Sequence, residues 1–194
     1  MEDIVSKIAS KQHPDHIWLL EHPPVYTAGT GTRQNDSDTT TRHLPYPLYQ
    51  TGRGGKITYH GPGQRIIYSL INLKKHPQGP DLRLFIQTLE LWMINTLKEL
   101  GVHPFLKEGM IGVWVKNQDG NDAKIAAIGV RARQWVTFHG MSLNIDPNLS
   151  HFEPIVPCGI SDFSVTSLKA LGISKTAQEI DQILMRTCPF VNFH

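Results

Sequence analysis

The chain has 194 residues, of which 40% are hydrophobic and 19% are charged, and its formal net charge is +2. A chain of this length buries roughly 70% of its unfolded surface, so we expect one domain over residues 1–194 and exclude a disordered chain. The small net charge gives no argument for nucleic-acid binding. Residues 1–10 carry no export signal, and no apolar stretch reaches the ~20 residues that cross a bilayer. We therefore expect a cytoplasmic protein, with a monomer as the default.

Short apolar runs bounded by Gly, Pro and Asn predict strands over much of the chain. The predicted strands are 17–20, 25–27, 56–60, 65–73, 112–115, 124–130, 135–139 and 141–145. The strands 112–115 and 124–130 are expected to form a hairpin around the polar turn 117–121. Residues 29–47 are polar and rich in Thr, Asp, Asn and Gly, and we expect a mobile flap there.

Two segments have the periodicity of helices. Residues 82–100 carry one apolar face and end at Gly101, and residues 176–186 form a shorter helix. The inward positions of the first helix are Leu82, Phe85, Ile86, Leu89, Trp92, Met93, Thr96 and Leu97, and those of the second are Ile180, Ile183 and Leu184. Strands with few helices imply an α+β fold (α/β sandwich), with a mixed or mostly antiparallel sheet covered by helices on one side.

Cys158, between a proline and a glycine, is the first candidate for chemistry. Lys124 lies 34 residues earlier, inside the apolar run 123–129. If the two side chains meet, the lysine stabilises the thiolate and makes Cys158 a nucleophile for covalent acyl chemistry. The alternative for Lys124 is an ordinary edge-strand lysine. Cys188 is expected to be a small structural residue, and a Cys158–Cys188 disulfide is disfavoured in a reducing compartment.

Two glycine-rich segments place histidines at the ends of strands. Residues 53–64 contain Gly54, Gly55 and His60, and residues 138–144 place His139 before a glycine. The plain interpretation is a hairpin with glycine-rich corners, whereas two such histidines together favour a pocket wall. Neither the spacing of a phosphate-binding loop nor that of a zinc site occurs, so we expect no metal.

With these segments in view, the chain resembles the lipoyl(octanoyl) transferase family of lipoate biosynthesis. The matching stretches are 20–27 with Gly29, 53–64, 123–126 with 128–130, 139–144, 157–160 and 164–168. The resemblance implies a fold like the catalytic domain of biotin and lipoate protein ligases. It also implies octanoyl transfer from octanoyl-acyl carrier protein to lysines of lipoyl domains, in 2-oxoacid dehydrogenases and the glycine cleavage H protein, without a cofactor.

The resemblance gives the role of nucleophile to Cys158 and that of activator and acid/base to Lys124. It assigns substrate contacts to Arg53, Gly54, Gly55, Lys56, Ile57, Thr58, Tyr59, His60, Ala127, Ile128, Gly129, Gly140, Met141 and Ser142. His60 and His139 are supporting candidates that would orient Lys124 or the carbonyl.

The stretch 126–129 is small or apolar, as a channel for an eight-carbon chain requires, and burial of that chain would contribute roughly 5 kcal/mol at about 0.8 kcal/mol per CH₂. Backbone N–H groups near Cys158, or at the Gly54–Gly55 corner, are alternative sites for the developing oxyanion.

Other functions remain as alternatives. One is an ATP-dependent lipoate or biotin protein ligase on the same fold, and another is a non-catalytic protein that binds lipoyl domains or acyl carrier proteins. A cysteine protease is disfavoured, because both histidines precede Cys158 and no orienting Asn or Asp is identifiable. Basic residues form either a rim for an acidic acyl carrier protein or an ordinary solvated face. These are Arg65, Lys74, Lys75, Arg131 and Arg133.

Overall fold

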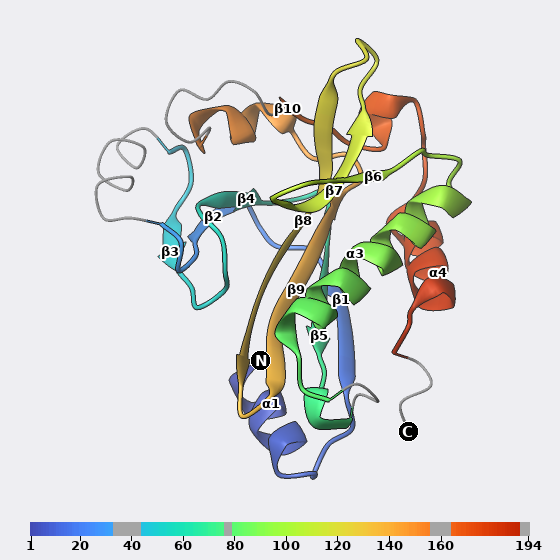
Figure 1. Cartoon of the computed structure of the whole chain (residues 1–194). Helices are drawn as coiled ribbons and strands as arrows, with labels where there is room; N and C mark the ends of the chain where they lie inside the picture. The colour runs from blue at the N-terminus through green and yellow to red at the C-terminus, as the bar shows by residue number, and fades with distance from the viewer. Residues whose placement is uncertain (33–43, 76–78, 156–163, 191–194) are drawn as a thin grey trace.

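The computed structural model describes residues 1–32, 44–75, 79–155 and 164–190, and these contain two sheets (Figure 1). The main sheet has seven strands in the order β1-β5-β9-β8-β7-β6, with β10 paired to β8. Its strands are β1 (His16–Leu20), β5 (Gln64–Leu70), β6 (Phe105–Lys107), β7 (Met110–Lys116), β8 (Asp122–Arg133), β9 (Val136–Asn144) and β10 (Ser164–Val165). The smaller sheet has the order β3-β2-β4. Its strands are β2 (Val25–Ala28), β3 (Leu48–Gln50) and β4 (Thr58–His60).

The main sheet is antiparallel apart from the parallel pair β10–β8, and β3 pairs parallel with β2. The predicted α+β class with a mixed sheet is therefore confirmed, as is the hairpin of β7 and β8. Short 3-10 helices connect some elements: η2 (Leu73–Lys75), η3 (Leu149–Ile155) and η5 (Lys169–Leu171).

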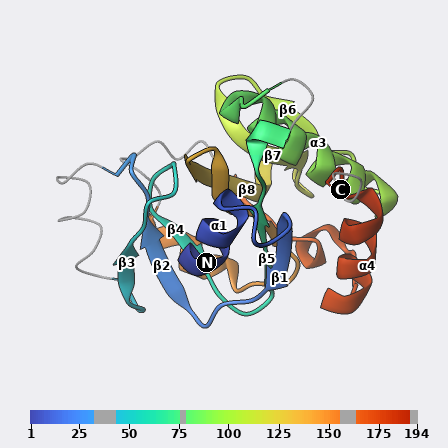
Figure 2. The same ribbon diagram turned by 90° about the horizontal axis from the view of Figure 1, so that it is seen from below.

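Two helices, α3 (Leu82–Glu99) and α4 (Ala177–Thr187), pack together on one side of the main sheet (Figures 1 and 2). Asp81 caps α3, and a capping box between Thr176 and Glu179 starts α4. The apolar face predicted for α3 packs in the main core. Burial of that face holds both helices to the sheet, since helices of this length depend on tertiary packing. No described helix is both long and apolar enough to cross a membrane.

A third helix, α1 (Glu2–Ala9), was not predicted, and it packs on the opposite face of the sheet. Ile67 of β5 belongs to the core under α3, whereas Leu70 of the same strand belongs to the cluster under α1. Residues three apart on a strand point to opposite faces, so the helices cover both sides. Figure 1 shows α1 at the lower end of the main sheet, against β9 and β5.

Several predicted boundaries are wrong for local reasons. The strand predicted at 65–73 ends at Leu70, where the hydroxyl of Thr137 accepts a hydrogen bond from the N–H of Ile71. The strand predicted at 56–60 begins at Thr58, because residues 52–56 form bends. The two strands predicted around Gly140 are a single strand, β9. The predictions also lacked β3, β6 and β10, and residues 33–43 of the predicted flap lie outside the described residues.

Candidate active site

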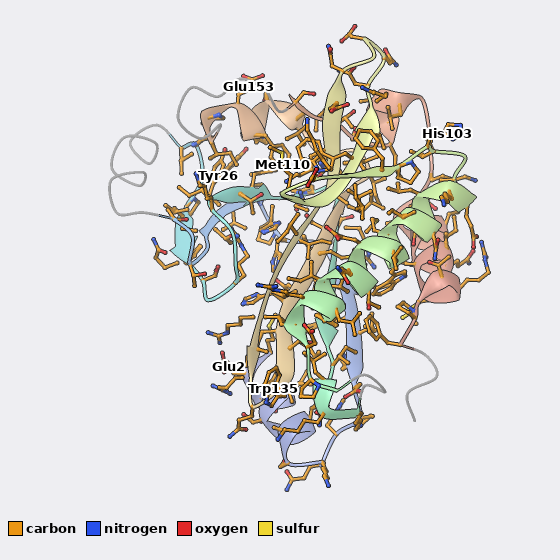
Figure 3. The ribbon with its side chains drawn as sticks, viewed as in Figure 1. Glu2, Tyr26, His103, Met110, Trp135 and Glu153 are labelled. Carbon is orange, nitrogen blue, oxygen red and sulfur yellow. The ribbon has the colours of Figure 1, made fainter. Side chains whose placement is uncertain are left out.

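A cavity of about 990 Å³ lies among the described residues of the two sheets. Its walls come from β2 and β4 of the small sheet and from β5, β7, β8 and β9 of the main sheet. Met110, labelled in Figure 3, lines it from β7. The volume is at the upper end of the range for small-molecule pockets.

A pair of glycines forms part of the cavity wall on the main sheet. Gly129 of β8 is paired with Gly140 of β9, and both line the cavity. A Cβ on Gly140 would lie 2.0 Å from the carbonyl oxygen of Ile67, and one on Gly129 would lie 3.1 Å from the carbonyl oxygen of Gly54. Glycine is therefore required at Gly140, where neighbouring backbone occupies the space of a side chain, whereas a side chain at Gly129 would make a tight contact that a small shift could relieve.

Hydrogen bonds from Arg53 hold the glycine-rich segment 53–64 in place between the two sheets. Its guanidinium donates to the carbonyl and hydroxyl oxygens of Thr27 on β2, at 2.6 and 2.8 Å, and to the carbonyl of Gly54 at 2.9 Å. The N–H of Gly54 donates to the carbonyl of Val130 on β8 at 3.0 Å. Burial lowers the pKa of Arg53 to about 10, which leaves it charged at neutral pH. The Gly54 N–H is already used and does not serve as a free oxyanion donor.

Lys124 lies half-buried in the cavity wall. Its ammonium donates to the carbonyl of Ile111 at 3.0 Å and lies 4.8 Å from the ring centre of Trp114. Burial lowers the pKa of Lys124 below its usual value, and the charge of Glu90 opposes that shift. A lysine with a lowered pKa releases its proton more readily than an ordinary surface lysine, which suits it to proton exchange.

A chain of amide hydrogen bonds fixes which ring nitrogen of His60 carries a proton. The Asn144 amide donates to the carbonyl of Thr166 at 3.0 Å, so its oxygen is the atom that accepts from Gln64 at 2.9 Å. The Gln64 oxygen then lies 2.6 Å from Nδ1 of His60, and that nitrogen carries the proton. Burial lowers the pKa of His60 to about 4, so the ring is neutral at pH 7 and Nε2 is an acceptor.

A second histidine, His139, enters the cavity from a strained position in β9. Its φ of 63° is unusual for a residue other than glycine, and its N–H donates to the sulfur of Met1. Burial, followed by the charges of Arg131 and Arg53, lowers the pKa of His139 to about 4. Nearby, Nε2 of His22 lies 2.7 Å from the hydroxyl of Tyr68.

The structure brings Lys124 and thirteen of the fourteen predicted substrate residues to this one cavity. The exception is Tyr59, which is 2% exposed and packs with Tyr26 (labelled in Figure 3) and Ile155 in a separate core. Cys158 lies outside the described residues. The residues on either side of its segment, Ile155 and Ser164, both line the cavity.

Several cavity residues were not singled out from the sequence, among them His22, Gln64, Tyr68, Trp114 and Asn144. For His22, Gln64 and Asn144, membership of the matched stretches was an available signal. No sequence motif marked Tyr68 or Trp114, because only strand pairing brings them to the cavity.

Four of the five basic residues considered as a partner rim are paired within the chain. Arg65 binds Asp181, Lys75 lies near Asp15, and both Arg131 and Arg133 bind Glu2. Trp135 lies in the turn between β8 and β9. Figure 3 shows Glu2 at the same end of the molecule as Trp135. These ion pairs favour an ordinary solvated surface over a basic rim that binds acyl carrier protein. Within the described part of the chain, no cluster of His, Cys, Asp and Glu is placed to hold a metal.

Comparison with known proteins gives a consistent set of similarities. Residues 1–188 match the family model of the lipoyl protein ligase A/B catalytic domain. The octanoyltransferase of Paramagnetospirillum magneticum is 50% identical over 191 residues, covering 98% of this chain and 88% of that protein. The octanoyltransferase of Nitrobacter winogradskyi is 52% identical over 192 residues, covering 96% and 80%.

Among solved structures, the bipartite lipoate protein ligase of Thermoplasma acidophilum matches with a TM-score of 0.70 at 14% identity, covering 98% of this chain and 77% of that chain. A lipoate-protein ligase A with bound ATP matches with a TM-score of 0.69 at 14% identity, covering 98% and 78%. At this identity the structural similarity shows a shared fold.

Proposed function

Because the chain belongs to the octanoyltransferase family, and is thus an acyltransferase of lipoate biosynthesis, we propose that it transfers octanoyl groups through a thioester on Cys158. The donor is octanoyl-acyl carrier protein, and the acceptor is a lysine of a lipoyl domain or H protein. Residues 1–194 act as a single catalytic domain. The observation that carries the proposal is the half-buried Lys124 amine in a large cavity.

The position of Lys124 in the fold supports its partnership with Cys158. Val165 of β10 pairs with Lys124, and Ile155 lines the same cavity. Cys158 follows Ile155 by three residues, a span of at most about 11 Å. The length of chain between Ile155 and Cys158 is therefore compatible with a thiol that meets Lys124, a cavity residue with a lowered pKa.

In the first step, the Cys158 thiolate attacks the thioester carbonyl of the donor. The bond between the carbonyl carbon and the pantetheine sulfur breaks, and the ammonium of Lys124 protonates the departing thiolate. One thioester replaces another, so the exchange is close to neutral in free energy and requires no ATP.

In the second step, the acceptor amine attacks the octanoyl-Cys158 carbonyl. A C–N bond forms, the bond to the Cys158 sulfur breaks, and neutral Lys124 takes the proton that the amine loses. His60 contributes an acceptor nitrogen that orients a donor in the cavity, since its other nitrogen is held by Gln64.

The small or apolar residues at 126–129 and the glycine pair leave room for the acyl chain along the sheet. The volume also leaves space for part of the pantetheine arm. An ATP-dependent ligase is the weaker alternative, because ligases share the fold at 14% identity, whereas octanoyltransferases are about half identical to this chain.

The test is the intact mass of the protein after brief mixing with octanoyl-acyl carrier protein, without ATP. We expect one added octanoyl group that a lipoyl domain discharges. The adduct should be absent from Cys158→Ala and present in the matched control Cys188→Ala. Transfer by Cys158→Ala at the wild-type rate would exclude the covalent route.

A second test addresses the role of Lys124. Lys124→Ala should slow the alkylation of Cys158 near neutral pH, because the thiolate loses a neighbouring cation and the pKa of the thiol rises. Lys116→Ala, at an exposed position of β7, is the control. Identical pH profiles for both variants would show that Lys124 does not activate the thiol.

A further inference from the structure

One peptide group, between Ile111 and Gly112 on β7, is hydrogen-bonded at both ends by charged side chains. The carbonyl of Ile111 accepts from the ammonium of Lys124 at 3.0 Å. The N–H of Gly112 donates to the carboxylate of Glu90 at 3.2 Å. In a trans peptide these two groups point in opposite directions, so the charges bind the same dipole from opposite sides. The anion lies at the N–H end and the cation at the carbonyl end, which is the favourable orientation.

Glu90 is in an unusual place for a carboxylate. It is 8% exposed on α3, where its neighbours Leu89 and Met93 are fully buried core residues. Glutamate is almost never buried to this extent unless it is paired, because desolvation of the charge is costly. Its hydrogen bond to the N–H of Gly112 connects this carboxylate to the strand that carries the Lys124 contact, and the packing of α3 does not require a charge there.

Gly112 allows the arrangement through its conformation and its size. Its φ of 119° lies in the region that favours glycine. A Cβ there would lie 2.7 Å from the carbonyl oxygen of Ala126 and 3.3 Å from Cε of Lys124. The glycine thus lets the lysine side chain pass beside β7 and reach the carbonyl of Ile111.

We propose that Glu90 is a positioning residue for Lys124, which acts through the Ile111–Gly112 peptide group to hold the lysine ammonium in the cavity wall. The proposal rests on the proposed function, in which Lys124 exchanges protons with the thiol and the amine. Glu90 touches no reacting atom, and its effect on the reaction is indirect.

Within the part of the chain that the structure describes, other charged groups near Lys124 do not replace Glu90. Lys107 of β6 lies 5.3 Å from the same Trp114 ring, and it binds Asp122 at 2.9 Å. Asp122 also binds Lys116 at 2.7 Å. Burial lowers the pKa of Lys124, and Glu90 is the charged group that raises it. Removal of that charge therefore favours the neutral amine.

The test compares Glu90→Gln with Glu99→Gln. Glutamine keeps the size and the acceptor oxygen but removes the charge, and Glu99 is an exposed residue of the same helix that binds Arg186. The pKa of Lys124 is measured from its rate of acetylation by acetic anhydride between pH 6 and 11, read by peptide mass spectrometry. A Cys158→Ala background prevents competition from the thiol.

We expect Glu90→Gln to lower the ratio of ammonium to amine at Lys124 about tenfold, and Glu99→Gln to leave it unchanged. Glu90→Met, which removes the charge without burying another polar group, serves as a second variant if Glu90→Gln is unstable. A wild-type acetylation profile in the folded Glu90 variant would overturn the proposal.

The same Glu90 substitutions, made in the chain that retains Cys158 so that octanoyl transfer can be assayed, separate the inference from the proposed function. If the acetylation profile shifts and the pH profile of octanoyl transfer shifts with it, both proposals hold. If the acetylation profile shifts while the transfer profile stays as in wild type, Glu90 positions Lys124, but Lys124 is not the proton-exchanging group.

Discussion

Lowering the pH from 7.5 to 5 is expected to destabilise the protein through His60. Burial lowers the pKa of this histidine from 6.5 to about 4 in the folded state. Between these values the unfolded chain binds a proton that the folded protein does not, so the free energy of unfolding falls as the pH falls. The contribution is fully present above pH 6.5, reaches about 3 kcal/mol in total, and loses about 2 kcal/mol by pH 5.

The assay is urea unfolding of the wild type and of His60→Gln at pH 7.5 and at pH 5. The glutamine side chain retains an N–H that can donate to Gln64, and it does not titrate. We expect the variant to lose about 2 kcal/mol less than the wild type between the two pH values. His103→Gln, at an exposed histidine, controls for the loss of a histidine as such.

Equal losses in His60→Gln and the wild type would refute the reasoning, because the burial of a neutral ring would then contribute nothing to the pH dependence. An NMR titration of the His60 ring gives an independent check. A midpoint near pH 6.5 in the folded protein would contradict the neutral state that burial imposes against the opposing hydrogen bond with Gln64.

Three further predictions concern stability. Gly140→Ala should lower the unfolding free energy by about 2 kcal/mol or more, since a Cβ would lie 2.0 Å from the Ile67 carbonyl oxygen; an unchanged melting temperature would contradict this. Gln64→Leu should cost about 1–3 kcal/mol in urea unfolding, because it leaves the buried Asn144 oxygen without its donor; no measurable loss would show that the amide chain is dispensable. Asp81→Ala should cost about 1 kcal/mol by removing the cap of α3, and an unaltered thermal unfolding curve would argue against the cap.

The sequence allowed the helices and the central strands to be predicted, because their patterns are local. The periodicity of α3 and the capping residue Thr176 are readable without tertiary information. Gly140 shows the opposite case. Glycine usually interrupts a strand, so two strands were predicted, yet β9 is continuous because the backbone of Ile67 approaches that position closely.

The candidate site divides in the same way. Lys124 and the glycine-rich segment around Arg53 are recognisable from sequence, since an apolar context or a glycine pair marks them. The contribution of Glu90 is not recognisable, because it depends on α3 packing against β7 with one carboxylate at the level of Gly112. An acidic residue beside the apolar stripe of a helix was the available signal.

The walls of the cavity come from parts of the chain as far apart as Met1 and Val165. No short fragment contains them, and the site exists only when both sheets have formed around it. Contacts of such long sequence separation are typical of slow folding. They also couple ligand binding in the cavity to the cooperative unfolding transition. A ligand that fills the cavity binds only the fully folded chain and not the unfolded one. At a concentration one hundred times its Kd, such a ligand adds about 2.7 kcal/mol to the stability of the whole fold.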